Sequence, residues 1–258
     1  MTADIQSQLT SLNLHHLAGN LDDLVARATR DRISPMAIIE AIARLETGER
    51  QRRSIERRLS SARIGRFRSM ADSDWAWPTA IDRERVERLL SVDFLAEADN
   101  VILASAPGLG KTMIARNVAH QAVLAGHSVL FVTAGQMLLD LEQQDGPRAL
   151  QTRLRRYTAP KLLWIDEVGY LSYNARSADL VFEVVNRRYE KGSILLTTNL
   201  AFQDWPKHFP GAACVTAMIE RLTHHAEILT IEGKSYRVEE ASERHEAKPT
   251  RPTKLTKG

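Results

Sequence analysis

The chain has 258 residues, of which 43% are hydrophobic and 26% are charged, so it contains enough apolar material for a globular core and is not disordered throughout. Its formal net charge of +3 is too small to identify a partner by itself. The apolar runs, such as residues 162–165, are far shorter than the ~20 residues of a membrane span, and the N-terminus lacks an export signal. We therefore expect a soluble, cytoplasmic protein with no membrane partner, and the single cysteine, Cys214, suits a reducing compartment.

The first 70 residues carry apolar side chains at helical spacing and contain few glycines. Ser34 and Pro35 provide a helix cap and a first-turn proline, which predicts one long helix from Met36 to Arg63 after a shorter pair of helices. We expect residues 1–70 to form an arginine-rich helical domain and residues 71–99 to form a connector that packs on the rest of the chain.

From residue 100 the pattern changes to short apolar runs that alternate with helical segments. Strands are predicted over residues 101–104, 128–132, 161–165, 193–198 and 227–231. Helices are predicted near residues 111–125, 135–143, 147–157, 176–190 and 214–225. Buried strands separated by helices are typical of a parallel sheet with helices on both faces, so the fold class is α/β. We expect this domain to span residues 100–239 and to be followed by a disordered tail, residues 240–258.

A phosphate-binding loop is predicted where the first of these strands meets its helix. The residues expected to bind ATP are Ser105, Ala106, Pro107, Gly108, Leu109, Gly110, Lys111 and Thr112. Backbone N–H groups of the loop and of the helix N-terminus would face the phosphates, Lys111 would neutralise charge, and the Thr112 hydroxyl would ligate Mg²⁺. Ser105 stands where the usual pattern has glycine, and we expect this small residue to be tolerated.

Polar residues follow two further strands at the edge where ligands of open α/β sheets bind. Asp166 is expected to hold Mg²⁺ with Thr112, and Glu167 to polarise the water that attacks the γ-phosphate. Asn199 directly follows the strand over residues 193–198 and is expected to orient that water. Its alternative role is a cap for the next helix. Together these residues predict an ATPase with ATP and Mg²⁺ as cofactors.

Five segments then carry a family resemblance: PGLGKT, WIDEVGYL, SILLTTNLAFQDW, MIERLTHH and GKSYRV. In this order and spacing the chain resembles the IstB-type transposition helper ATPases of insertion sequences, relatives of the DnaC helicase loaders in the AAA+ class. The family loop usually opens with Gly-Pro, whereas this chain has Ser105-Ala106. The resemblance implies an AAA+ P-loop ATPase domain after an α-helical N-terminal domain, and a homo-oligomer that binds double-stranded target DNA and recruits or stimulates a transposase. It also implies that Arg221 is similar to an arginine finger acting on a neighbouring subunit, and Arg237 to a second sensor.

Two arginine clusters are candidates for largely sequence-independent contacts to DNA phosphates. They contain Arg52, Arg53, Arg57 and Arg58 in the long helix, and Arg153, Arg155 and Arg156 at mid-chain. The alternative for the first cluster is a solvated helix face, because three glutamates lie among its arginines.

Three competing functions remain open: a DnaC-like helicase loader, a small-molecule kinase that uses the same loop, and a DNA-binding architectural protein with an inactive ATP site. The kinase is disfavoured because Glu167 beside Asp166, followed by Asn199, favours water as the acceptor. No metal role is expected for the histidine pairs His15-His16 and His224-His225, since neither has a cysteine or paired carboxylate at ligand spacing in the sequence.

Overall fold

The computed structural model describes residues 2–66, 68–70, 81–169, 173–209 and 213–233. The predicted tail, Arg237 and residues 71–80 of the predicted connector lie outside these ranges. The chain divides into two compact units, Met1–Ser60 and the part from Ser61 onward. None of the helices in the described ranges has the length and apolar content required to cross a membrane.

The first unit is helical, as the sequence predicts. It contains α1 (Thr2–Ser11), α2 (His15–Arg30) and nearly all of α3 (Pro35–Ala62). Ser34 caps α3, since its hydroxyl accepts a hydrogen bond from the N–H of Ala37 at 3.3 Å. The buried carboxylate of Glu46 accepts the N–H of Leu17 at 2.7 Å, so a side chain of α3 satisfies the first turn of α2.

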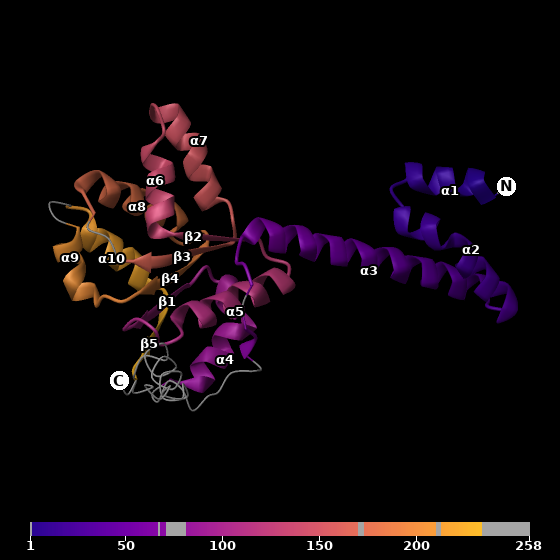
Figure 1. Ribbon diagram of the computed structural model, residues 1–258, viewed down its shortest axis with the longest axis horizontal. Helices are drawn as coiled ribbons and strands as arrows, with labels where there is room; N and C mark the ends of the chain where they lie inside the picture. Colours follow the sequence, from indigo (N-terminus) through magenta and orange to yellow (C-terminus); the bar gives the residue numbers. More distant parts are fainter. Residues whose placement is uncertain (1, 67, 71–80, 170–172, 210–212, 234–258) are drawn as a thin grey trace, which may run out of the picture. The chain divides into compact units, whose positions relative to one another are not determined.

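The second unit contains a five-stranded sheet with the order β2-β3-β4-β1-β5, in which every pair is parallel. The strands are β1 (Asn100–Ser105), β2 (Val129–Thr133), β3 (Leu162–Val168), β4 (Ser193–Thr198) and β5 (Ala226–Ile231). All five predicted strands are therefore found, each within a few residues of its expected bounds. Because the strands are parallel, the C-terminal ends of β1, β3 and β4 share one edge of the sheet (Figure 1).

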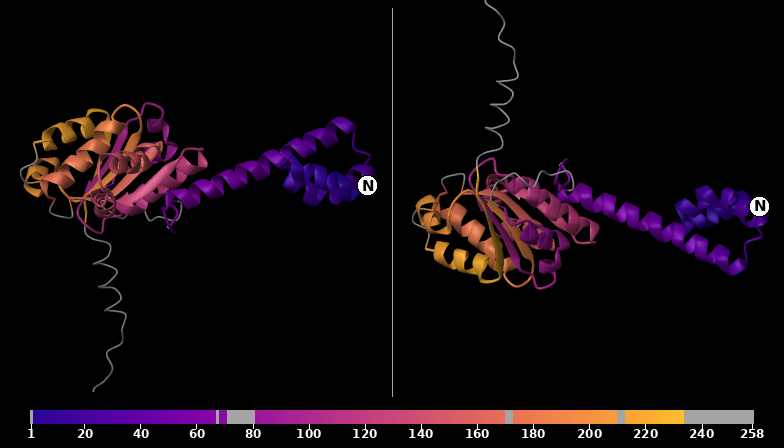
Figure 2. Two further views of the ribbon diagram at one scale, coloured as in Figure 1. Left: turned by 90° about the horizontal axis from the view of Figure 1, so that it is seen from above. Right: turned by 90° about the horizontal axis from the view of Figure 1, so that it is seen from below.

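Helices cover both faces of this sheet (Figure 1 and Figure 2). They are α4 (Arg83–Ser91), α5 (Lys111–Leu124), α6 (Ala134–Glu142), α7 (Pro147–Thr158), α8 (Ala175–Arg188), α9 (Trp205–His208) and α10 (Val215–His224), with short 3₁₀ turns at Asp93–Leu95 and Phe202–Asp204. All five predicted crossover helices begin and end within two residues of the expected positions.

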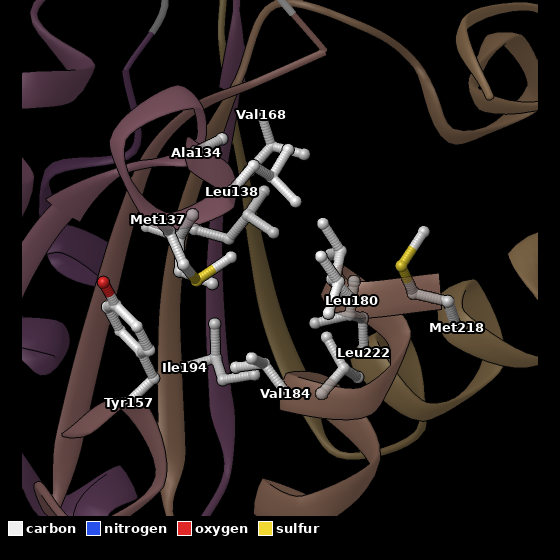
Figure 3. Packing of buried hydrophobic residues seen from close by; sticks show 14 of the residues in the cluster. Ala134, Met137, Leu138, Tyr157, Val168, Leu180, Val184, Ile194, Met218 and Leu222 are labelled. Atoms are coloured by element: carbon white, nitrogen blue, oxygen red, sulfur yellow. The ribbon is translucent and has the colours of Figure 1, made fainter. Parts of the chain in front are cut away.

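Alternate side chains of each strand point to opposite faces, and both faces are apolar. Ile102 and Ile165 belong to a buried cluster with side chains of α6, α7, α8 and α10, part of which is shown in Figure 3. The other face of the sheet carries Val101, Leu103 and Trp164, which alternate with these residues and are fully buried. Helix α5 packs on this face and contacts α4. Burial of each large side chain contributes about 1.5–3 kcal/mol, so two apolar faces fix the sheet between its helices.

Arg188, the last residue of α8, is a buried clamp on the sheet edge opposite the site, with only 1% of the residue exposed. Its guanidinium donates to the carbonyl oxygens of Tyr157 at 3.0 Å, Pro160 at 2.8 Å, Lys161 at 3.0 Å and Ser193 at 2.7 Å. Burial lowers the pKa of Arg188 to about 10. One side chain thus joins the end of α7 to the starts of β3 and β4.

Candidate functional site

The loop between β1 and α5 has the backbone of a phosphate-binding loop. Gly108 and Gly110 adopt φ angles of +85° and +89°, which a residue with a side chain reaches only with strain. The amides of Met113 and Ile114 bond to the carbonyl of Gly110, so α5 begins directly at the loop. Ser105 lies in β1 and is not among the residues with positive φ, so replacing glycine there introduces no backbone strain.

Lys111 lies folded against the start of its own loop. Its ammonium donates to the carbonyl oxygens of Ser105 at 2.6 Å and Ala106 at 3.0 Å, and to the Ser105 hydroxyl at 3.0 Å. That hydroxyl donates in turn to the Ala106 carbonyl at 2.9 Å. The residue that departs from the glycine pattern therefore supplies an additional oxygen that holds the lysine in the loop.

Asp166 lies near the end of β3 with only 5% of the residue exposed. Thr112 Oγ1 lies 3.5 Å from Asp166 Oδ1, and the hydroxyl of Thr197, on the neighbouring strand β4, donates a hydrogen bond to the same oxygen. Carboxylate and hydroxyl oxygens are hard ligands of the kind that Mg²⁺ prefers. The structure therefore brings together Thr112 and Asp166, the two residues that the sequence predicts as magnesium ligands.

Glu167 lies in a bulge of β3. Ile165 pairs with Leu196 but Val168 pairs with Thr198, so two residues of β3 lie opposite one residue of β4. Glu167 has a φ of +63°, and its N–H donates to the hydroxyl of Thr197 at 3.0 Å. Asp166 is buried while the adjacent Glu167 is exposed. The two neighbouring carboxylates therefore have different surroundings, one in the protein interior and one in solvent.

Asn199 lies one residue beyond β4 and lines a cavity of about 540 Å³ together with Ser105, Ala106 and Leu109. Its side-chain Oδ1 is buried and has no hydrogen-bond partner among the described residues. A buried polar oxygen without a partner is costly, so this atom is suited to meet a donor from a bound molecule or its water. The cavity opens beside the loop but is not lined by Lys111, Thr112 or Asp166. It is the oxygen donors of Thr112 and Asp166, next to the glycine-rich loop, that fit a nucleotide with its Mg²⁺.

The turn after Glu167 requires glycine. Gly169 has a φ of +93°, and a Cβ on it would lie 2.4 Å from Leu200 Cδ1. Its N–H donates to the hydroxyl of Tyr173 at 3.0 Å, and the Tyr173 ring stacks on Phe209 at 4.3 Å. The turn that follows the two carboxylates is therefore packed against the segment that follows Asn199.

Arg221 lies in the last turn of α10 and is half-buried against α8. Its guanidinium carbon lies 5.2 Å from the ring centre of Phe182 and 6.0 Å from that of Tyr189. One terminal nitrogen donates to the carbonyl of Ala217 at 3.0 Å. The aromatic contacts and the hydrogen bond hold the arginine at the end of its helix without a carboxylate partner among the described residues.

Acidic residues compensate part of the first arginine cluster. Arg52 and Arg53 both bond to the buried carboxylate of Glu49, at 2.8 Å and 2.6 Å. These contacts lower the pKa of Glu49 to about 2, with the Arg52 hydrogen bond as the largest cause. Arg57 is exposed and forms no ion pair with another described residue, whereas Arg58 bonds to the Ser54 hydroxyl at 2.7 Å.

An acidic residue also compensates part of the second arginine cluster. Asp140 of α6 pairs with Arg153, lies 3.7 Å from Arg156 and accepts the hydroxyl of Tyr157. The Arg153 hydrogen bond is the largest cause that lowers the pKa of Asp140. Arg155 is exposed and has no carboxylate partner in the described ranges. The sequence therefore located both clusters but not the acidic residues that neutralise part of each.

Thr197 is the residue of this site that the sequence interpretation missed. It lies inside an apolar strand, and its contacts to residues 166 and 167 come from a different strand. A threonine one position before the strand end, beside a strand that ends in two acidic residues, is the only signal that could have identified it.

Comparison with known proteins is consistent with this geometry. A family model described as IstB-like ATP binding protein matches residues 7–244. The ATP-binding protein of insertion sequence IS21 from Pseudomonas aeruginosa is 34% identical over 237 residues, covering 92% of this chain and 89% of that protein. The corresponding protein of insertion sequence IS5376 from Geobacillus stearothermophilus is 31% identical over 229 residues, covering 89% of this chain and 91% of that protein.

Solved structures show the same fold at lower identity. The DnaI crystal structure matches with a TM-score of 0.53 at 21% identity, over 66% of this chain and 93% of that chain. The replication initiator DnaA bound to AMPPCP and single-stranded DNA matches with a TM-score of 0.51 at 18% identity, over 69% of this chain and 58% of that chain. These likenesses concern the fold alone, an AAA+ P-loop domain. The family model and the two relatives confirm the resemblance seen in the motifs: the chain belongs to the IstB-like family of ATP-binding proteins, whose named relatives come from insertion sequences.

Proposed function

We propose that this protein is a DNA-binding helper ATPase of transposition that binds ATP with Mg²⁺ and hydrolyses it to ADP and phosphate. The observation that carries the proposal is the meeting of Thr112, Asp166 and Glu167 at one sheet edge beside the loop that contains Lys111. Membership of a family named for ATP binding supports the choice of nucleotide.

Each residue then has a separate task. The loop amides and Lys111 bind phosphate oxygens, and Lys111 must leave the carbonyls of its own loop to do so. Thr112 and Asp166 hold Mg²⁺, which supplies charge neutralisation at the phosphates when bound. The exposed Glu167 accepts a proton from the attacking water, and the unpartnered Oδ1 of Asn199 accepts a hydrogen bond that orients it.

We further propose that hydrolysis takes place in a homo-oligomer, with Arg221 serving a neighbouring subunit. Support comes from its position at the end of α10, where the rings of Phe182 and Tyr189 hold the guanidinium in place. A positive charge beside the transferred phosphate is a large contributor to phosphoryl-transfer rates. Arg237 is proposed as a second nucleotide-sensing residue on the family resemblance alone.

The proposed partners are double-stranded DNA and a transposase. The insertion-sequence relatives support the transposase, and the exposed arginines of α3 and α7 support binding to DNA phosphates. A helicase loader would share the ATP site and differ in its protein partner. Pull-down with an insertion-sequence transposase, compared with a replicative helicase, distinguishes the two functions.

The experiment that tests the ATPase compares wild type with Lys111→Ala and Glu167→Gln. Loss of a general base costs typically 10²–10⁴-fold in rate, so Glu167→Gln is expected to bind ATP normally and to hydrolyse it at least about 100-fold more slowly. Lys111→Ala is expected to lose ATP binding. Nucleotide binding is measured with a fluorescent ATP analogue and turnover by phosphate release. Equal turnover by wild type and Glu167→Gln would refute the role of Glu167.

A further inference from the structure

The ends of α8 and α10 bring three metal-binding groups together on the surface. These are the carboxylate of Glu190 and the imidazoles of His224 and His225, whose ligand atoms all lie within 4.8 Å of one another. We propose that they bind one divalent transition-metal ion of the zinc class. This site is separate from the phosphate-binding loop and does not depend on the proposed function.

The donor set determines the class of ion. Two imidazoles and one carboxylate suit Zn²⁺, Ni²⁺ or Co²⁺, whereas Mg²⁺ prefers an all-oxygen shell. Three protein ligands leave a fourth position for water. In a tetrahedral zinc site with ligand bonds near 2.1 Å the ligand atoms lie about 3.4 Å apart, so the three exposed side chains need to close by roughly an ångström.

His224 already has the support that metal-binding histidines commonly have. The hydroxyl of Tyr189 lies 2.7 Å from His224 Nδ1. When Nδ1 carries the proton and donates it to this hydroxyl, Nε2 presents its lone pair to a metal. The tyrosine therefore orients one of the proposed ligands.

The backbone beneath the histidines is fixed to the sheet. The carbonyl of His225 accepts the N–H of Asn100 at 2.7 Å, and the Asn100 side chain donates to the carbonyl of Leu222 at 3.1 Å. The same side chain accepts the N–H of Ile194 at 2.9 Å. The rings of His224 and His225 lie edge to face at 4.1 Å. Ligands held on rigid elements bind metal with little reorganisation.

The third ligand is equally constrained. Glu190 follows the buried Arg188 clamp by two residues and has a φ of +58°, in a turn closed by bonds from Lys191 and Gly192 to the carbonyl of Arg188. A bound ion would join this turn to the end of α10. Both elements contribute to the surroundings of Arg221, which packs on Tyr189. The sequence interpretation expected no metal here because the histidine pair has no cysteine or paired carboxylate at ligand spacing, whereas the fold supplies a carboxylate from 34 positions earlier than His224.

The test uses the full, untagged chain freed of metal. Titration with Zn²⁺ against a chromophoric indicator is expected to show one tight site per chain, and Co²⁺ should give the intense visible absorption of a four-coordinate site. His224→Ala and His225→Ala should each abolish that site and that spectrum. Glu190→Gln should weaken Zn²⁺ binding, and Tyr189→Phe should weaken it about tenfold, the usual effect of losing a hydrogen bond to a ligand.

The chain offers a matched control in its other histidine pair. His15→Ala combined with His16→Ala removes two adjacent histidines that belong to no three-ligand cluster among the described residues, and it should leave the tight site unchanged. Because the proposed ligands are exposed, the metal-free variants should melt at the temperature of the wild type. Zn²⁺ binding that is unchanged in His224→Ala and His225→Ala, or that is lost equally in the control, would overturn the proposal.

Discussion

The hydroxyl of Thr197 donates a hydrogen bond to the carboxylate of Asp166. The hydroxyl oxygen of Thr197 also accepts a hydrogen bond from the N–H of Glu167 at 3.0 Å, at the bulge of β3. One side chain of β4 therefore fixes both the buried carboxylate proposed for Mg²⁺ and the backbone of the exposed carboxylate proposed for water activation.

We predict that Thr197→Val slows ATP hydrolysis more than it weakens ATP binding. Valine has nearly the same shape but leaves the Asp166 oxygen and the Glu167 amide without their partner, at a cost of about 1–3 kcal/mol for each buried group. A misplacement worth 1.36 kcal/mol in the transition state is a tenfold loss in rate. The measurements are kcat, the Mg²⁺ concentration for half-maximal rate and the ATP Kd.

Thr197→Ser is the matched control, because it retains the hydroxyl. It should keep most of the wild-type kcat and Mg²⁺ dependence. If valine and serine gave the same kcat, the hydroxyl would have no positioning role, and the bulge alone would hold the two carboxylates.

Gly169→Ala is predicted to destabilise the protein through crowding as well as backbone strain. A positive φ costs a residue with a side chain roughly 1–2 kcal/mol, and the new Cβ would lie 2.4 Å from Leu200 Cδ1. Gly126→Ala provides the control, since Gly126 has a φ of +97° and nothing within 4 Å of its Cβ position. Urea unfolding should show a larger loss for Gly169→Ala than for Gly126→Ala.

A double-mutant cycle separates the two causes at Gly169. In a Leu200→Ala background the obstructing atoms are absent, so Gly169→Ala should cost about as much as Gly126→Ala does. An equal cost of Gly169→Ala with and without Leu200 would show that crowding contributes nothing.

The sequence predicted the fold well because its information is local and periodic. Strands such as residues 101–104 are short apolar runs between helical segments, and their two buried faces require that pattern. The glycine geometry of the loop between β1 and α5 was equally predictable, because Gly108 and Gly110 occupy the positions of positive φ that only glycine adopts freely.

The remaining features depend on residues that are distant in the chain. The sequence around Asp166 does not indicate that Thr197 will contact it, and the sequence around His224 does not indicate that Glu190 will lie beside it. The bulge at Glu167 is likewise a property of the pairing between β3 and β4 rather than of either strand. Local patterns thus indicate which residues carry the chemistry, whereas the positioning residues emerge only from the tertiary structure.

Arg221 is predicted to act across a subunit boundary. Arg221→Ala and Lys111→Ala should each lose hydrolysis alone, and mixing them should restore part of it, because some interfaces then pair an intact loop with an intact arginine. The control mixes Lys111→Ala with the double variant Lys111→Ala/Arg221→Ala, which contains no intact loop and should stay inactive. Absence of recovery at every mixing ratio, with assembly confirmed by light scattering, would exclude the role in trans.

The structure divides the arginines proposed for DNA into two groups. Arg52, Arg53 and Arg153 are paired with carboxylates, so a phosphate must displace an existing partner before binding them. Arg57 and Arg155 are exposed and have no such partner among the described residues. The exposed group should therefore contribute more to the salt dependence of DNA binding.

Arg148 of α7 is exposed like Arg155 and lies seven residues before it. We predict that Arg155→Gln combined with Arg148→Gln flattens the salt dependence of duplex DNA binding. Each lost phosphate contact should reduce the slope of log K against log salt by about 0.9. Arg153→Gln should change the slope less, because in the wild type its charge is already used by Asp140. On α3, Arg57→Gln and Arg52→Gln make the same comparison between an exposed arginine and one that is paired with a carboxylate.

The slopes are measured by fluorescence anisotropy with ATP and with ADP, since assembly on ATP would multiply weak contacts along the duplex. Slopes that stay at the wild-type value in both exposed-arginine variants would show that neither cluster touches the phosphates, and a protein would then be the main partner of this chain.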